Sequence, residues 1–367
     1  MTFRPTNPAS SSTSLAGNSA RPLPRILAVT NMYPTAEDPT YGTFVATQMA
    51  SVAGLGAVVH IHFVDGRRSI LKYVAAIPEV RRLARSGAYD LVHAHYGLSG
   101  FVASFQPLPL LISFCGDDLL GTPDGHGSTT WKSKLIRRMS RYAARRADAI
   151  ICKSEELRLS LPRTVERRRA HVIGNGVDTQ HFKPGDRGAA RKQLGIDLSE
   201  LLILFPHSRR QWAVKRFDLA EAAVRSLGAQ GMKTRLWVVN GVSPAAMPVY
   251  YQAADCLLLT SDHEGSPNVV KEALCCDLPV VSVDAGDVRR WFSLTKGCYM
   301  VDRDPRAIAD GLRTVLTRGV RVDGTRVRSE LGLDTVSRLV MSVYREAVAG
   351  RGTSIVGDAM RQDRSDS

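Results

Sequence analysis

The sequence lacks the features that would place the protein inside a membrane or among disulfide-stabilised secreted proteins. No apolar run approaches the roughly eighteen residues that a membrane-spanning helix needs. The six cysteines show neither a CxxC spacing nor a framework pattern, which favours reduced thiols and a cytoplasmic protein. Residues 1–22 are rich in Ser, Pro, Ala and Asn without the apolar segment of a secretory signal, so they predict a disordered tail.

A cluster of metal ligands and a nucleic-acid recognition motif are also missing from the sequence. His93 and His95 would share one face of a strand, but no third ligand follows at a metal-binding spacing. The pattern favours His93 as a core histidine and His95, nearer the carboxyl end of the strand, as a residue that lines a cleft. We expect no metal site. We also expect no nucleic-acid partner, because the basic residues lie on helices without interleaved exposed aromatics.

The chain is long and strongly basic. Its 367 residues carry a formal net charge of +14, and 44% of them are hydrophobic. This length allows two globular domains of ordinary size, each with its own core. The positive balance is compatible with nucleic acid, an anionic membrane surface or phosphorylated substrates as partners.

Residues 130–146 predict a strongly basic amphipathic helix. Trp131, Leu135, Met139 and Tyr142 recur at helical spacing and predict a buried stripe. The other face carries a row of cations, namely Lys132, Lys134, Arg137, Arg138, Arg141 and Arg145. Such a face suits anionic lipid headgroups and predicts a peripheral association with the inner face of the cell membrane. A solvated helix face is the alternative interpretation, and the sequence leaves both open.

Apolar runs alternate with helical patterns along the chain, which is typical of α/β domains with parallel sheets. The first series begins with a buried strand at 25–30, and the second restarts at 201–205, after the tight turn at 175–178. The expected division is a disordered tail over 1–22, Rossmann-like domains over 23–174 and 175–333, a helix over 334–349 and a disordered tail over 350–367.

The most informative stretch is residues 264–286, EGSPNVVKEALCCDLPVVSVDAG. It follows a strand and predicts a polar turn, a helix and a second strand, so the turn falls at the carboxyl end of a parallel strand, where α/β sheets bind ligands. Gly265, Ser266 and Asn268 lead into the helix, whose free amides favour a phosphate. Glu272, one helical turn further, can accept two hydrogen bonds from a diol such as a ribose. Together these features predict a nucleotide site.

Taken alone, this turn is also compatible with an ordinary strand-to-helix junction whose glutamates only offset the helix dipole. However, the Glu-x7-Glu spacing of Glu264 and Glu272, with Gly265 after the first and residues 279–281 (Pro-Val-Val) after the second, resembles the donor signature of glycosyltransferase family 4. The resemblance extends over residues 24–348. It implies a GT-B fold, with two Rossmann-like domains facing across a cleft and a C-terminal helix that crosses back to the first domain.

The resemblance also implies roles for individual residues. Glu264 would orient the hydroxyls of the transferred hexose, and Glu272 would bind the ribose. Arg209 and Lys215 match the Arg and Lys that hold the donor pyrophosphate in the family, although solvated loop cations are the alternative. The catalytic candidates are therefore Glu264, Arg209 and Lys215. The donor-binding candidates are Arg210, Gly241, Val242, Gly265, Ser266, Pro267, Asn268, Val269 and Glu272.

The acceptor side departs from the family pattern at two positions. The loop after the first strand usually carries a Gly-Gly pair, and here only Gly42 remains for a close backbone approach. Cys115 stands where family members usually have a histidine close to the reacting sugar. The acceptor or cleft candidates are Gly42, His95, Cys115 and Asp117. Asp117 and its neighbour Asp118 are suited either to acceptor hydroxyls or to a plain turn.

The resemblance implies a retaining, metal-independent hexosyltransferase that needs no cofactor, since the nucleotide sugar is a substrate. Asp302-Arg-Asp304 resembles the Asp-x-Asp metal site of the other large transferase fold, but it lies far from the nucleotide signature and predicts a helix-capping loop. The expected acceptor is a saccharide, a lipid-linked molecule or another acceptor. The expected context is the biosynthesis of cell-surface polysaccharides or glycoconjugates. The alternatives are a nucleotide-sugar epimerase of the same fold, and an inactive GT-B frame that binds membranes or nucleic acid.

Overall fold

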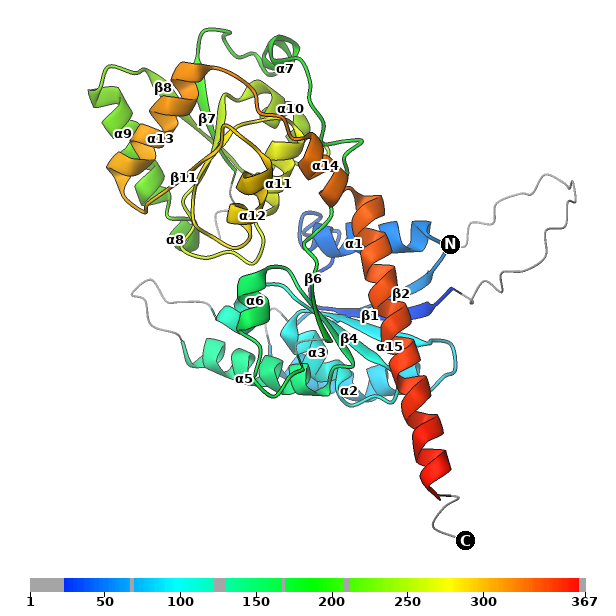
Figure 1. Cartoon of the computed structure of the whole chain (residues 1–367). Helices are drawn as coiled ribbons and strands as arrows, with labels where there is room; N and C mark the ends of the chain where they lie inside the picture. Colours follow the sequence, from blue (N-terminus) through cyan, green and yellow to red (C-terminus); the bar gives the residue numbers. More distant parts are fainter. Residues whose placement is uncertain (1–22, 67–68, 122–129, 167–168, 207–211, 363–367) are drawn as a thin grey trace, which may run out of the picture.

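The computed structural model describes residues 23–66, 69–121, 130–166, 169–206 and 212–362, which form two α/β domains that face each other (Figure 1). Each domain is built on one parallel sheet. The first sheet has six strands in the order β2-β1-β3-β4-β5-β6, and the second has five in the order β11-β10-β9-β7-β8. The parallel α/β architecture predicted from the sequence is confirmed.

The first domain owes its sheet to short runs of apolar residues. The strands are β1 (Arg25–Thr30), β2 (Val58–Phe63), β3 (Leu91–His95), β4 (Leu110–Phe114), β5 (Ala149–Cys152) and β6 (Ala170–Val172). The helices are α1 (Thr43–Gly54), α2 (Leu71–Ala84), α3 (Gly97–Ala103), α4 (Asp117–Leu120), α5 (Trp131–Arg146) and α6 (Glu155–Leu159). Every residue of β3, β4 and β5 is buried, because helices cover both faces of a parallel sheet.

The second domain repeats this arrangement. Its strands are β7 (Leu201–Pro206), β8 (Thr234–Val239), β9 (Cys256–Leu259), β10 (Val280–Val283) and β11 (Tyr299–Val301). Its helices are α7 (Arg187–Leu194), α8 (Trp212–Lys215), α9 (Phe217–Ala229), α10 (Met247–Ala253), α11 (Asn268–Cys275), α12 (Val288–Leu294), α13 (Pro305–Arg318) and α14 (Thr325–Leu331). α9 and α13 cover one face of the sheet, and α10, α11, α12 and α14 build the core on the other.

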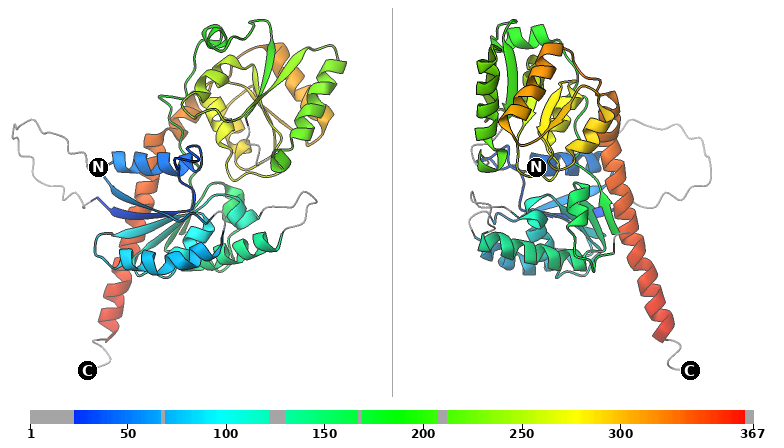
Figure 2. Two further views of the ribbon diagram at one scale, coloured as in Figure 1. Left: turned by 180° about the vertical axis from the view of Figure 1, so that it is seen from behind. Right: turned by 60° about the vertical axis from the view of Figure 1, so that its left-hand side comes forward.

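The last helix, α15 (Leu333–Gln362), returns from the second domain to the first (Figure 2). It packs on α1 and on β3, β4 and β5, and its buried side chains include Val340 and Tyr344. The predicted crossing is therefore present, but the predicted disordered tail over 350–367 is wrong as far as Gln362, and 363–367 lie outside the described residues. Helix extension is easy once the helix is nucleated, and no proline follows Leu333 to stop it.

The buried stripe predicted for α5 is wrong at three of its four positions, and of the four only Met139 packs, partly buried, against the core. Trp131 is 70% exposed, and Leu135 and Tyr142 are also exposed, whereas the small residues Ser140 and Ala143 are buried. The cause lies in α3, which approaches α5 so closely that a Cβ atom on Gly97 would lie 1.9 Å from the Ser140 hydroxyl oxygen. Such close helix packing requires small side chains at the contact, and it rotates the large apolar residues towards the surface.

Candidate active site

The cleft between the domains contains a pocket of about 470 Å³. One wall comes from the first domain, and the other comes from α8 and the turn before α11. The first wall and the linker contribute Met32, Phe44, Tyr96, Cys115, Gly116, Asp117 and Asn175, and the second wall contributes Val214, Lys215 and residues 263–269. Nine predicted site residues face this pocket, namely Cys115, Asp117, Lys215, Glu264, Gly265, Ser266, Pro267, Asn268 and Val269. The pocket lies at the carboxyl ends of the parallel strands, where ligands of α/β folds bind.

An ion pair joins two of the three predicted catalytic residues, Lys215 and Glu264. Lys215 Nζ lies 2.5 Å from Glu264 Oε1, and the Ser261 hydroxyl donates a hydrogen bond of 2.7 Å to the same oxygen. Both charged side chains are largely buried. Removing one partner would leave the other charge without compensation in a partly desolvated site, so the two side chains act as a unit.

The glycine after Glu264 lies directly against the backbone of the first domain. A Cβ atom on Gly265 would lie 1.9 Å from the carbonyl oxygen of Cys115 and 3.2 Å from the Cα atom of Gly116. No side chain fits there without separating the walls of the pocket. Steric exclusion of a side chain therefore explains why a glycine follows Glu264 in the predicted donor signature.

The start of α11 is fixed to the linker between the domains by polar contacts. Lys271 Nζ donates to Ser266 Oγ at 2.9 Å and to the carbonyl oxygen of Asn175 at 3.2 Å. Ser266 Oγ in turn donates to Asp287 Oδ2 at 2.7 Å, and the amide of Asn175 donates to Asn268 Oδ1 at 3.2 Å. These contacts hold the amino end of α11 in the cleft, where its free N–H groups favour an anion.

Glu272 lies one turn further along α11, outside the residues that line the pocket. Its Oε2 accepts a hydrogen bond of 2.7 Å from the hydroxyl of Tyr251 on α10, and burial raises the pKa of the carboxyl above its usual range. Sequence reasoning did not find Tyr251, because nothing in the spacing of two tyrosines on a separate helix indicates which one reaches Glu272. The role of Glu272 towards a ribose stays a prediction.

Several other predicted donor residues are not brought together by the described structure. Arg209 and Arg210 lie outside the described residues. Gly241, with a φ of 70°, and Val242 lie in the loop after β8, and Val242 packs against the core of the second domain. Neither belongs to the described residues that line the cleft pocket, so their position beside a base stays a prediction.

On the first domain, the prediction that His95 lines the cleft is wrong. His95 is fully buried, its ring lies 4.0 Å from that of His93, and burial lowers its pKa to about 3. β3 is a central strand covered on both faces, so a side chain at its end still points into the core. His93 is the core histidine expected from the sequence, with Tyr344 and Ser113 within 2.7 and 2.8 Å of its two ring nitrogens.

Asp117 and Asp118 have different roles. Asp117 lies in the pocket with its Oδ1 3.2 Å from Nε2 of His263 in the second domain, and this contact raises the pKa of His263. Asp118 is buried and accepts hydrogen bonds from the amides of Gly97, Cys115 and Gly116. Asp118 therefore shapes the turn after β4. Of these two aspartates, only Asp117 remains a candidate for binding the acceptor substrate. His263, which contacts Asp117 across the cleft, was missed because no motif or spacing marks it.

Gly42 and Cys115 occupy the positions where the sequence departs from the family pattern. Gly42 adopts a φ of 70°, and a Cβ atom there would lie 2.3 Å from the carbonyl carbon of Met32, which lines the pocket. Cys115 lines the pocket itself, and burial raises the pKa of its thiol to about 12. The thiol is therefore neutral at physiological pH and is a poor nucleophile.

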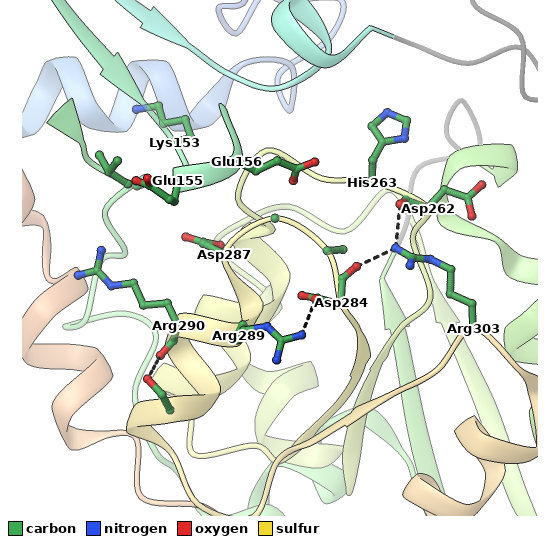
Figure 3. A pocket seen from close by; sticks show the side chains of 15 residues that line it. Lys153, Glu155, Glu156, Asp262, His263, Asp284, Asp287, Arg289, Arg290 and Arg303 are labelled. Carbon is green, nitrogen blue, oxygen red and sulfur yellow. Dashed lines mark hydrogen bonds and ion pairs between the residues drawn. The ribbon is translucent and has the colours of Figure 1, made fainter. Parts of the chain in front are cut away.

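A larger pocket of about 900 Å³, drawn in Figure 3, shares His263 with the cleft pocket and is otherwise lined by different residues. Its arginines already have partners, since Arg289 lies 2.6 Å from Asp284 and Arg303 donates to the carbonyl oxygens of Asp262 and Asp284. Among the described residues, the buried ammonium of Lys153 has no hydrogen-bond partner. None of the predicted site residues that the structure describes lines this pocket. The smaller cleft pocket is therefore the candidate active site.

Three further findings in the described segments bear on the sequence predictions. Asp304 Oδ1 accepts hydrogen bonds from the amides of Arg306 and Ala307, so the Asp-x-Asp stretch caps α13 as predicted. In the part of the chain that the structure describes, no three His, Cys, Asp or Glu side chains gather as metal ligands. Within the same part, no helix is both long and apolar enough to cross a membrane.

Two facing Rossmann-like domains, a ligand cleft between them and a returning C-terminal helix define the GT-B class of glycosyltransferases. Sucrose-phosphate synthase from Thermosynechococcus elongatus matches this fold with a TM-score of 0.72 at 16% identity, over 89% of this chain and 100% of that one. HepE from Anabaena, solved with UDP and glucose, matches with a TM-score of 0.66 at 15% identity, over 88% of this chain and 99% of that one. The predicted GT-B fold is confirmed.

The family follows from the sequence comparisons. Residues 29–181 match the model for Glycosyltransferase Family 4, and residues 216–318 match that for Glycosyl transferases group 1. The chain belongs to glycosyltransferase family 4 and is a glycosyltransferase. Its relatives include D-inositol 3-phosphate glycosyltransferases of Geodermatophilus obscurus, 25% identical over 79% of this chain and 74% of the relative, and Xylanimonas cellulosilytica, 26% identical over 76% and 77%.

Proposed function

We propose that the protein transfers a sugar from a nucleotide sugar to a hydroxyl of a saccharide or lipid-linked acceptor, with retention of the anomeric configuration and without a divalent cation. The ion pair of Lys215 and Glu264 in the cleft pocket carries this proposal, because it supplies a cation for a diphosphate next to a carboxylate for sugar hydroxyls. HepE, solved with UDP and glucose, supports a nucleotide sugar as the donor. Polysaccharide or glycoconjugate synthesis is the proposed context.

In the proposed complex, the donor diphosphate lies between Lys215 and the amino end of α11. The diphosphate replaces Glu264 as the partner of Lys215, and this exchange leaves the Glu264 carboxylate to orient hydroxyls of the hexose. Glu272 accepts the ribose hydroxyls, while the Tyr251 hydroxyl fixes its orientation. Catalysis then depends on positioning and on charge, with Lys215 stabilising the negative charge that develops on the leaving group.

The proposed reaction exchanges one bond at the anomeric carbon for another. The acceptor hydroxyl forms the new carbon–oxygen bond, the bond from the anomeric carbon to the diphosphate breaks, and the hydroxyl proton passes to the departing diphosphate. The neutral Cys115 thiol is unsuited to form a covalent intermediate. Retention, which the family resemblance implies, then requires attack on the face from which the diphosphate leaves.

A panel of UDP-, GDP- and ADP-sugars in buffer with EDTA tests this function. We expect the sugars of one nucleotide (UDP, GDP or ADP) to raise the melting temperature of the protein. A ligand at a hundredfold excess over its Kd stabilises the folded state by about 2.7 kcal/mol. Transfer should continue in EDTA, since Lys215 provides the positive charge at the diphosphate. Activity that EDTA abolishes and manganese restores would contradict the metal-independent reaction. Rearrangement of the sugar without an acceptor would instead identify an epimerase.

The proposed function includes peripheral binding to anionic membranes through the first domain. α2 and α5 lie on the side of this domain that faces away from the second domain (Figure 1). Their exposed apolar residues include Leu71 at 71%, Val74 and Trp131, and exposed cations of α5 flank them: Lys132, Lys134, Arg138, Arg141 and Arg145. Apolar side chains with cations beside them suit the interface of an anionic bilayer.

Liposome co-sedimentation tests this membrane association. We expect binding to vesicles with anionic lipids that decreases with salt, and a loss of at least about tenfold in the Lys134→Glu/Arg138→Glu variant, because each basic residue contributes about 1 kcal/mol. The matched control is Lys233→Glu/Lys296→Glu, which reverses two exposed lysines of the second domain. Equal binding to neutral and anionic vesicles, or an equal loss in both variants, would count against this face.

A further inference from the structure

A separate pocket of about 440 Å³ lies in the first domain, between the loop after β1 and the helices α2 and α5. Its inner end is polar. Asn31 is 7% exposed, and its amide nitrogen donates a hydrogen bond of 2.9 Å to the Tyr73 hydroxyl. Within the described segments, the Asn31 Oδ1 atom has no hydrogen-bond partner. A buried acceptor without a donor is costly, so this atom is suited to a ligand hydroxyl.

Tyr96 connects this pocket with the candidate active site. This residue lines both the pocket of the first domain and the cleft pocket. Its backbone has a φ of 78° and a ψ of 145°, an unfavourable conformation for a residue with a side chain. Backbone strain of this kind persists where the surrounding structure holds it, and it is frequent at ligand sites. The two pockets are therefore neighbours that share a wall at Tyr96.

The outer end of the same pocket is apolar and reaches the surface between α2 and α5. Leu98 and Ile136 line it, together with the exposed side chains of Ile70, Trp131 and Leu135. Lys132 lies at this end, with its ammonium 5.9 Å from the centre of the Trp131 ring. An exposed tryptophan and aliphatic residues beside a cation form a surface that an amphiphilic molecule would cover.

We infer that the acceptor is a saccharide carried on a lipid, and this inference rests on the proposed function. The sugar lies between the cleft pocket and Asn31, and the lipid leaves between α2 and α5 towards a membrane surface. The two ends of the pocket match the two ends of such a molecule. A small phosphorylated polyol, such as the D-inositol 3-phosphate of the relatives' name, would leave the apolar end unfilled.

Binding of alkyl glucosides tests this inference directly. The probes are methyl, hexyl, octyl and phenyl β-D-glucopyranoside, each below its critical micelle concentration and measured by calorimetry. We expect affinity to rise with chain length, with octyl glucoside at least about tenfold tighter than methyl glucoside, because each buried methylene adds to the affinity. The Trp131→Ala/Leu135→Ala variant should lose this gain.

Leu159→Ala is the matched control, because Leu159 is an exposed apolar residue of the first domain on α6, away from this pocket. It should keep the full gain with chain length. Equal binding of methyl and octyl glucoside, or an equal loss in the control, would overturn the inference. Phenyl glucoside as tight as octyl glucoside would assign the pocket to an aromatic acceptor and overturn it too. UDP titrated into the same proteins separates these outcomes from a failure of the proposed donor site.

Discussion

Replacement of Lys215 by alanine should lower turnover by about 10²–10³-fold, the usual effect of losing one group that stabilises charge in the transition state. It should also weaken the binding of the free nucleoside diphosphate, because the diphosphate is present both before and after transfer. The structure places the ammonium of Lys215 in the cleft pocket, close to the amino end of α11. Turnover under single-turnover conditions and calorimetry with the nucleotide measure the two effects.

The control for this substitution is Lys233→Ala. Lys233 is exposed and directly precedes β8. It therefore lies at the amino ends of the parallel strands, whereas the pocket lies at their carboxyl ends. Lys215→Arg provides a second control, since it keeps the positive charge and the pairing with Glu264. If Lys215→Ala keeps wild-type turnover while its fold is intact, Lys215 does not carry the diphosphate. Recovery of part of the activity in Lys215→Arg would support the role of charge.

Substitution of the two glutamates of the donor signature should have different effects on nucleotide binding. Glu272→Ala should weaken nucleoside diphosphate binding by about ten- to a hundredfold, because hydrogen bonds to a charged group contribute about 1.5–3 kcal/mol. Glu264→Ala should leave nucleotide affinity intact or slightly raised, since it frees Lys215 from its ion pair, and it should lower turnover. Calorimetry with the nucleotide alone, followed by turnover with the full donor, distinguishes these outcomes.

Tyr251→Phe is a milder perturbation of the same site as Glu272→Ala and serves as its control. It removes only the hydroxyl that donates to Glu272 Oε2, so the carboxylate remains but loses a partner that orients it. The loss of nucleotide affinity should be smaller than in Glu272→Ala. An unchanged affinity in Glu272→Ala, or a loss in Glu264→Ala that equals it, would contradict the assignment of ribose and hexose to these residues.

The donor half of the site could be predicted because its information is local in the sequence. The strand, turn and helix around residues 256–275 are contiguous. Val269, Val270, Ala273 and Leu274 have the spacing of one helix face; the last three are buried as this spacing predicts, whereas Val269 is half-buried and lines the cleft pocket. The turn before α11 must then lie at the carboxyl edge of the sheet, whatever the rest of the chain does. This geometry alone brings residues 264–269 to one wall of the pocket.

The acceptor half was harder to predict because it depends on packing between distant segments. The stripe of α5 that includes Trp131 and Leu135 has the spacing of a buried face, but the approach of Gly97 to Ser140 turns it outwards. His95 has the position of a cleft residue in its strand, but the helices on both faces of the sheet bury it. Asn31 and Tyr73 are 42 residues apart, and only the fold brings them into one hydrogen bond.

The most direct test of the donor site is a parallel calorimetric titration of UDP, GDP and ADP into the wild type and the Lys215→Ala, Glu264→Ala and Glu272→Ala variants. One nucleotide should bind the wild type and Glu264→Ala with similar affinity, and should bind Lys215→Ala and Glu272→Ala at least about tenfold more weakly. Folded variants that all bind this nucleotide like the wild type would show that the donor does not lie in the cleft pocket.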